Sequence, residues 1–161
     1  MGKVVVNVLV IAIIIAGFAA IYMHVERGEP NVTEKELMRV ADKFQDSVTK
    51  AHFQWMAEGK PDIIILVQYD NNGHETDRRP VHMNKAGFPN VSESESGCGK
   101  LWQMLLNQPM KVDGFQIFGE YFSEPSDTSG KLTNWCRFRL SRGAHFDYLF
   151  AQGKVIKEGD T

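Results

Sequence analysis

The chain opens with a continuous apolar run and then changes to amphipathic and alternating patterns. Residues 4–23 contain a single polar side chain, that of Asn7. A helix of these 20 residues would cover about 30 Å, which is the thickness of the hydrocarbon core of a bilayer. The run therefore predicts a transmembrane helix at 4–23, preceded by a short tip at residues 1–3.

Two other interpretations of the apolar run stay open. A cleaved signal peptide has an apolar stretch of only about 7–15 residues that ends in small residues, and the nearest such site, at 17–19, lies inside the run. A buried helix of a soluble domain is the third alternative. Lys3 precedes the run, whereas the segment 24–27 carries no net charge. The positive-inside rule therefore predicts a cytoplasmic N-terminus and an external C-terminal part.

The second pattern is a helical stripe. A capping box begins at Thr33, and Gly59 supplies a stop. Between them, apolar residues recur at steps of three and four: Leu37, Val40, Ala41, Phe44, Val48, Ala51, Trp55 and Met56. This spacing predicts a long amphipathic helix over 34–58. Because Pro30 disfavours helical geometry, residues 24–33 form either a joint between two helices or a kink in one long helix.

Strand patterns begin after the long helix. A β-branched run at 62–69 and a return strand at 74–83 flank Asn72-Gly73, a strong two-residue hairpin signal. A short helix is predicted over 100–106, and further strands over 112–122, 132–140, 144–150 and 154–157. In the 132–140 strand, Cys136, Phe138 and Leu140 share one face, while Arg137 and Arg139 lie on the other.

The order of these elements predicts the fold class. One long helix followed by strands is typical of an α+β domain in which the helix packs on an antiparallel sheet. The part of the chain from 34 to 161, about 130 residues, is long enough for one domain with its own core.

Charge narrows the class of partner. Lysine and arginine number 18 and aspartate and glutamate 20, which gives a net charge of −2. Because the chain has no basic stripe, no nucleic-acid partner is expected.

The chain contains two cysteines, Cys98 and Cys136. In an exported domain two cysteines are expected to pair. Closing a loop of 38 residues would stabilise the fold by about 3–4 kcal/mol on the chain-entropy argument. If the domain were cytosolic, two unrelated buried thiols would be the better interpretation.

The sequence carries no recognisable catalytic or metal motif. It has no nucleophile elbow, phosphate-binding glycine loop or zinc-protease signature. His74 and His82 would lie at opposite ends of one hairpin, too far apart to share a metal ion. Six aromatic residues would either line a pocket or fill the core, and their spacing favours the core: Trp55, Trp102, Trp135, Phe138, Phe146 and Tyr148. We therefore expect no enzymatic activity, no cofactor and no small-molecule substrate.

Four segments occur in an order that resembles a known family. They are GFP at 87–89, CGKLWQMLL at 98–106, NWCRF at 134–138 and HFDYLFAQGKV at 145–155. Together with the apolar and amphipathic helices, they are similar to type IV pilins and pseudopilins. In detail they resemble the MshF family, which serves the biogenesis of the mannose-sensitive haemagglutinin (MSHA) pilus.

The resemblance implies both a fold and a role. It implies a pilin-like periplasmic domain on a single-pass protein of the bacterial inner membrane, with its N-terminus in the cytoplasm. Such a protein helps to assemble a type IV pilus without enzymatic activity. Its partners would be other pilus-assembly proteins and pilin-like subunits. The resemblance also implies a structural role for Cys98 and Cys136.

Small residues in the apolar run bear on helix packing. Ala16, Gly17, Ala19 and Ala20 would permit close approach of neighbouring pilin-like helices. The alternative is that small residues simply occur often in membrane helices.

The N-terminus departs from the pilin pattern. Pilins are cut after a glycine and carry a glutamate five residues into the mature chain. Here Gly2 is followed by Lys3, and the fifth residue after Gly2 is Asn7. We therefore expect an anchored accessory protein. A minor pilin at the fibre or its tip, and a membrane-tethered periplasmic binding module or enzyme, remain alternatives.

Overall fold

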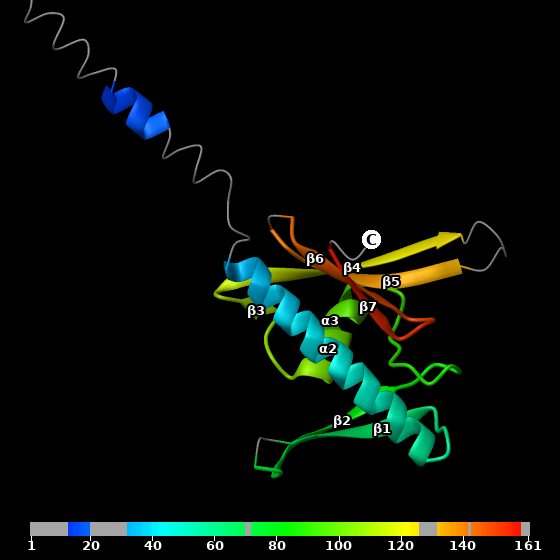
Figure 1. The fold of residues 1–161 in the computed structure, drawn as a ribbon. Coiled ribbons are helices and arrows are strands. Elements are labelled where there is room, and N and C mark those ends of the chain that lie inside the picture. The colour runs from blue at the N-terminus through cyan, green and yellow to red at the C-terminus, as the bar shows by residue number, and fades with distance from the viewer. Residues whose placement is uncertain (1–12, 20–31, 70–71, 126–131, 142, 159–161) are drawn as a thin grey trace, which may run out of the picture. The chain divides into compact units, whose positions relative to one another are not determined.

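The computed structural model describes residues 13–19, 32–69, 72–125, 132–141 and 143–158 (Figure 1). The chain divides into two compact units, Met1–Val32 and Thr33–Thr161. Each unit is described by itself below.

The first unit contains a helical segment at 13–19 whose large apolar side chains are exposed. Most of the predicted span 4–23 and of the predicted joint 24–33 falls outside the described residues. Within the described ranges, no helix combines the length and the apolar character needed to cross a bilayer.

The second unit consists of a long helix, a β-hairpin, a short helix and a β-meander. Its elements are α2 (Val32–Ala57), β1 (Ile63–Tyr69), β2 (Glu75–His82), α3 (Glu95–Leu106), β3 (Lys111–Val112), β4 (Phe115–Pro125), β5 (Leu132–Leu140), β6 (His145–Leu149) and β7 (Lys154–Lys157). Strands β3 to β7 pair in sequence order as a five-stranded antiparallel sheet. The α+β class is confirmed. The hairpin β1–β2, however, forms a separate two-stranded sheet.

Two predicted boundaries were wrong, one at a helix cap and one at a hairpin turn. Helix α3 begins at Glu95, since the Ser94 side chain accepts a hydrogen bond from the Gly97 amide. The predicted strand 112–122 is broken by Asp113 and Gly114, whose φ angles are 49° and 82°. This Asp-Gly pair makes a two-residue hairpin turn between β3 and β4.

The connection between β1 and β2 is longer than the predicted two-residue turn. Tyr69 pairs with Glu75, and the register shifts between Gln68 and Tyr69. The connection therefore includes more residues than Asn72 and Gly73.

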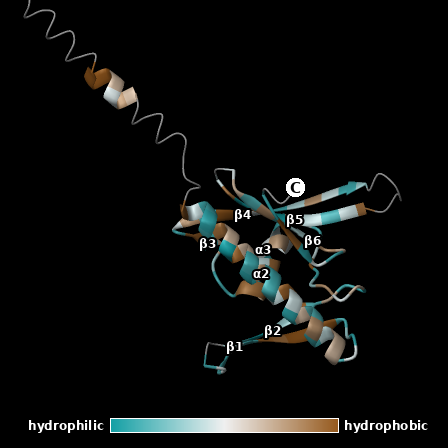
Figure 2. Cartoon of the chain, viewed as in Figure 1, coloured by the Kyte–Doolittle hydropathy of each residue, from teal (hydrophilic) through white to brown (hydrophobic). Residues whose placement is uncertain are grey.

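The core is centred on aromatic rings between α2 and the five-stranded sheet. The ring of Phe44 on α2 lies 5.3, 5.6 and 5.4 Å from those of Phe138, Phe146 and Tyr148. Trp102 on α3 contacts the same cluster, 5.3 Å from Phe138. All five side chains are fully buried. Figure 2 shows hydrophobic and hydrophilic residues alternating along α2, as the predicted amphipathic stripe requires.

A disulfide joins α3 to the sheet next to this cluster. Cys98 and Cys136 are bonded, with 5.6 Å between their Cα atoms, and neither residue is exposed. The expected use of the aromatic residues in the core holds for five of the six. Trp135 is the exception, because it lies on the other face of β5.

Replacing Phe44 with alanine should lower the free energy of unfolding by about 3–5 kcal/mol, because the cavity would lie between the helix and three rings. Phe53→Ala, at a side chain 62% exposed on the same helix, is the matched control and should change stability by less than about 0.5 kcal/mol. Urea unfolding followed by tryptophan fluorescence measures both. Equal losses for the two variants would contradict this account of the core.

Candidate interaction surface

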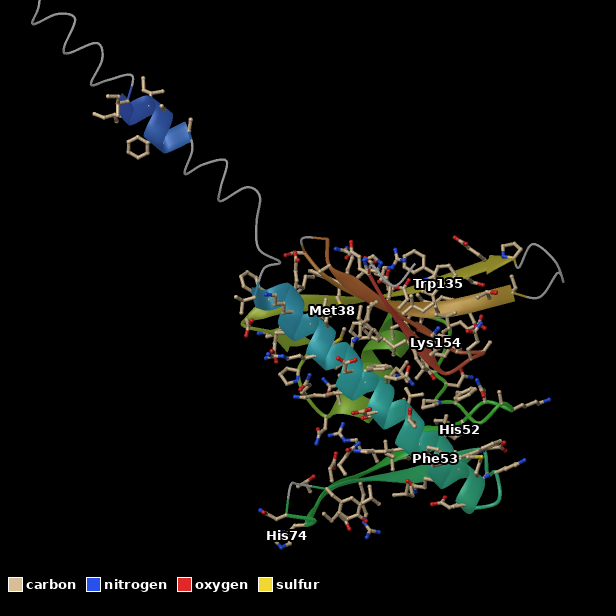
Figure 3. The ribbon with its side chains drawn as sticks, in the orientation of Figure 1. Met38, His52, Phe53, His74, Trp135 and Lys154 are labelled. Carbon is tan, nitrogen blue, oxygen red and sulfur yellow. A yellow bond between two sulfur atoms is a disulfide. The ribbon has the colours of Figure 1, made fainter. Side chains whose placement is uncertain are left out.

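The two faces of the five-stranded sheet differ in what they contact. Successive side chains of a strand point to opposite faces of the sheet. When every second residue is buried on one face, the residues between them therefore lie on the other. On β5, Cys136, Phe138 and Leu140 are buried on the face that α2 and α3 contact. Trp135, Arg137 and Arg139 consequently lie on the other face, which we call the outer face (Figure 3 labels Trp135).

Strands β4 to β7 contribute to the outer face in register. Its residues include Phe118, Glu120 and Phe122 of β4, Trp135, Arg137 and Arg139 of β5, His145, Asp147 and Leu149 of β6, and Lys154 and Ile156 of β7. The pairing sets Phe118 opposite Arg139, and Phe122 opposite Trp135. Aromatic and charged residues are therefore interleaved across the strands.

Each arginine of the outer face is held by a carboxylate. Arg137 donates through Nε and Nη2 to the two carboxylate oxygens of Asp147, at 2.8 and 2.7 Å. Arg139 donates through Nε to Oε1 of Glu120 at 2.8 Å, and its Nη2 lies 2.7 Å from the same oxygen. The hydrogen bond from Arg139 lowers the pKa of the Glu120 carboxyl below its ordinary value. The pairs fix both guanidinium groups on the sheet.

The same arginines lie over aromatic rings. The guanidinium carbon of Arg137 is 5.3 Å from the ring centre of Phe122, and that of Arg139 is 5.2 Å from the ring centre of Phe118. Phe122 in turn stacks on Trp135, with ring centres 5.4 Å apart. Phe118 is the most exposed of these rings, at 43%. Ordered tryptophan, phenylalanine and arginine side chains are typical of the energetically important parts of protein interfaces.

The segments that carried the family resemblance meet inside the domain. Gly87 has a φ of 82°, and a Cβ there would lie 2.3 Å from ring atoms of Trp55. A Cβ on Gly153 would lie 2.0 Å from the ring of Phe88. The two glycines therefore allow the 87–89 turn to pack against both α2 and the segment before β7.

Hydrogen bonds hold this turn against the sheet. Asn84 donates from Nδ2 to the Phe150 carbonyl at 2.8 Å, while its Oδ1 accepts from the Phe88 amide at 3.0 Å. The buried Tyr148 hydroxyl donates to the Pro89 carbonyl at 2.9 Å. Burial raises the pKa of Tyr148, so this hydroxyl stays protonated as a donor. These residues have a structural role, joining the connection after β2 to the sheet.

The predicted site residues fall into two groups. Cys98 and Cys136 are brought together. Ala16, Gly17 and Ala19 lie in the helical segment 13–19, whereas Ala20 is outside the described residues. In the part of the chain that the structure describes, no three His, Cys, Asp or Glu side chains are grouped so that they could hold a metal ion.

A groove of about 660 Å³ lies between β2 and α3, away from the outer face. It is lined by Arg79, Pro80, His82, Ser96, Gly99, Lys100, Gln103 and Met104. Arg79 donates to Asp77, to the Gln103 carbonyl and to Asn107. Its guanidinium therefore serves to fasten β2 to the end of α3.

Searches of protein-family models, of curated proteins and of solved structures find no match to this chain.

The Glu120–Arg139 pair should stabilise the fold in a pH-dependent way. A carboxyl whose pKa is lowered by folding stabilises the native state above its ordinary pKa of 4.5, and this stabilisation is lost as the pH falls through the lower, folded value. Wild type should therefore be more stable than Glu120→Gln at neutral pH, and the difference should shrink as the pH falls below 4.5 and disappear once the pH is below the lowered pKa of the folded state. Urea unfolding at a series of pH values measures it.

Glu124→Gln, at an exposed position of the same strand, is the control for that series. Its difference from wild type should stay small at every pH. A Glu120→Gln difference that is unchanged through the acid range would show that the ion pair contributes nothing to stability.

Proposed function

We propose that the protein is a non-enzymatic accessory component of type IV pilus assembly, of the MSHA kind. Segment 4–23 anchors it in the bacterial inner membrane, and the unit 33–161 acts in the periplasm as an interaction domain. The outer face of the sheet binds the periplasmic domain of a pilin-like subunit or of another assembly protein. The observation that carries the proposal is the ordered set of aromatic and arginine side chains on that face.

The arrangement of helix and sheet supports the pilin-like part of the proposal. Phe44 attaches a long N-terminal helix to one face of an antiparallel meander, and the opposite face remains for contacts with neighbours. The same order of an apolar segment, an amphipathic helix and a sheet is found in the pilin family that the sequence resembles.

The disulfide supports the periplasmic location. Disulfides persist in oxidising compartments such as the bacterial periplasm and are rare in the cytosol. The bonded pair Cys98–Cys136 lies in the core of the 33–161 unit and fits an exported domain.

The anchor has a proposed role of its own. Ala16, Gly17, Ala19 and Ala20 allow a neighbouring pilin-like helix to approach closely within the membrane.

Photocrosslinking tests the proposed interface. A photoreactive amino acid at Phe118 of the full chain, in a bacterium that assembles this pilus, should give adducts with pilin-like subunits or assembly proteins, identified by mass spectrometry. The same probe at Phe53, which is on α2 and is more exposed (62% against 43%), is the control and should give few (Figure 3). Adducts at Phe118 that contain no pilus protein would refute the proposal.

Piliation gives a functional measure of the same surface. In a strain lacking the native gene, Phe118→Asp should reduce the number of surface pili several-fold, because a carboxylate would sit beside Glu120 in the contact. Phe53→Asp should support normal piliation. A mature form that begins at Lys3 and is found in sheared pili would instead identify a fibre subunit.

The oxidation state of the cysteines tests the location independently. Because both cysteines are buried, cells are quenched in acid and the protein is denatured before alkylation. Cys98 and Cys136 should then resist alkylation until a reductant is added, and they should react without reductant in a strain that lacks periplasmic thiol oxidase. Free thiols in the wild-type strain would contradict the periplasmic assignment.

A further inference from the structure

The hairpin β1–β2 has one blocked edge and one open edge. On β2, Pro80 has no amide hydrogen to donate, and the His82 carbonyl already accepts from the Asn90 amide at 2.8 Å. Among the described residues, no strand pairs with the other edge of β1. Figure 1 shows this hairpin beside the C-terminal end of α2.

The register identifies the backbone groups on the open edge. The Met83 amide donates to the Asp62 carbonyl at 2.8 Å, so Asp62 and every second residue after it direct their backbone groups toward β2. Ile63, Ile65 and Val67 consequently direct their amide and carbonyl groups away from β2.

One contact caps part of this edge. The side-chain amide of Gln54 on α2 donates to the Ile65 carbonyl at 2.7 Å. Beyond it, a hollow of about 360 Å³ lies between α2 and the second half of β1, lined by Lys50, Gln54, Leu66, Val67, Gln68 and Tyr69. The Gln54 contact is thus a local cover at the Ile65 carbonyl, and the hollow separates α2 from the edge of β1 at Val67.

The side chains of β1 suit pairing with an uncharged strand. Ile64 and Leu66 are 1% and 2% exposed and hold the strand on the core. Ile63 and Ile65, on the other face, are 45% and 46% exposed. None of the seven residues of β1 is charged. A long, apolar and uncharged edge strand is a template for a further strand.

We propose that two copies of this chain associate by antiparallel pairing of their β1 strands about a two-fold axis at Ile65. In this register the two Ile65 residues exchange backbone hydrogen bonds, and the partner's amide replaces Gln54 at the Ile65 carbonyl. Ile63 lies opposite Val67, and Asp62 lies opposite the neutral Gln68, so no like charges face each other. The two hairpins become one four-stranded sheet.

A second copy fits this edge because the strand complements itself. Branched aliphatic side chains meet branched aliphatic side chains on the exposed face, and backbone groups meet the same groups of the partner. A two-stranded hairpin is also a marginal sheet, and doubling it adds a ladder of hydrogen bonds. This inference is independent of the pilus assignment, since it uses only the hairpin and α2.

Cysteine crosslinking in the full chain tests the pairing. Two copies with different epitope tags are co-expressed in a bacterial membrane, each carrying Ile65→Cys, and oxidised mildly. A disulfide-linked species with both tags should form at least fivefold more than with Phe53→Cys, an exposed control on α2. The native cysteines do not interfere, because they are buried and bonded to each other. Equal yields at the two positions would overturn the proposal.

Register and the role of Gln54 give sharper tests. Ile63→Cys should crosslink with Val67→Cys in the other copy several-fold more than with itself. Gln54→Ala should raise the yield of the Ile65→Cys crosslink, because it removes the side chain that occupies the carbonyl of residue 65. Ile63→Lys should lower that yield at least fivefold, because it places a charge on the edge strand. Crosslinks of Ile65→Cys to another protein without the mixed-tag species, or yields indifferent to Ile63→Lys, would refute pairing between copies.

Discussion

The packing of Phe44 among Phe138, Phe146 and Tyr148 determines most of what the rest of the 33–161 unit can do. It attaches α2 to one face of the sheet. Helix α3 covers the same face, where it is held by the Cys98–Cys136 disulfide and by the contact of Trp102 with Phe138. Because strand residues alternate, filling one face with aromatic rings commits the neighbouring positions to the other. The outer face is therefore a consequence of the core as much as a feature of its own.

The loop after β2 shows how distant segments depend on one another. Asn84 donates a hydrogen bond to the carbonyl of Phe150, the residue after β6, and Gly87 allows close contact with Trp55 on α2. Gly153, which lies 66 residues further along the chain, leaves space for Phe88. The residue types in short, distant segments can thus depend on one another without any catalytic role, because each segment provides the space or the hydrogen bond that another needs.

Local patterns were sufficient for some features and insufficient for others. The three- and four-residue steps from Leu37 to Trp55 located α2, and alternation in β5 separated Phe138 from Arg137. The break at Asp113 was missed although its turn signal is local. The pairing of Glu120 with Arg139, and the separation of the hairpin from the larger sheet, depend on strand register across the fold. Register is set jointly by which face of each strand is buried and by the turns between strands, so one strand taken alone does not determine it.

Pro80 has a consequence for how far a sheet built on this hairpin can extend. It has no backbone donor, and the His82 carbonyl beside it is already satisfied by Asn90. A strand added next to β1 therefore makes a sheet whose far edges are both closed to further strands. Association by this route therefore stops at a symmetric dimer. A hairpin with two open edges would instead allow indefinite polymerisation.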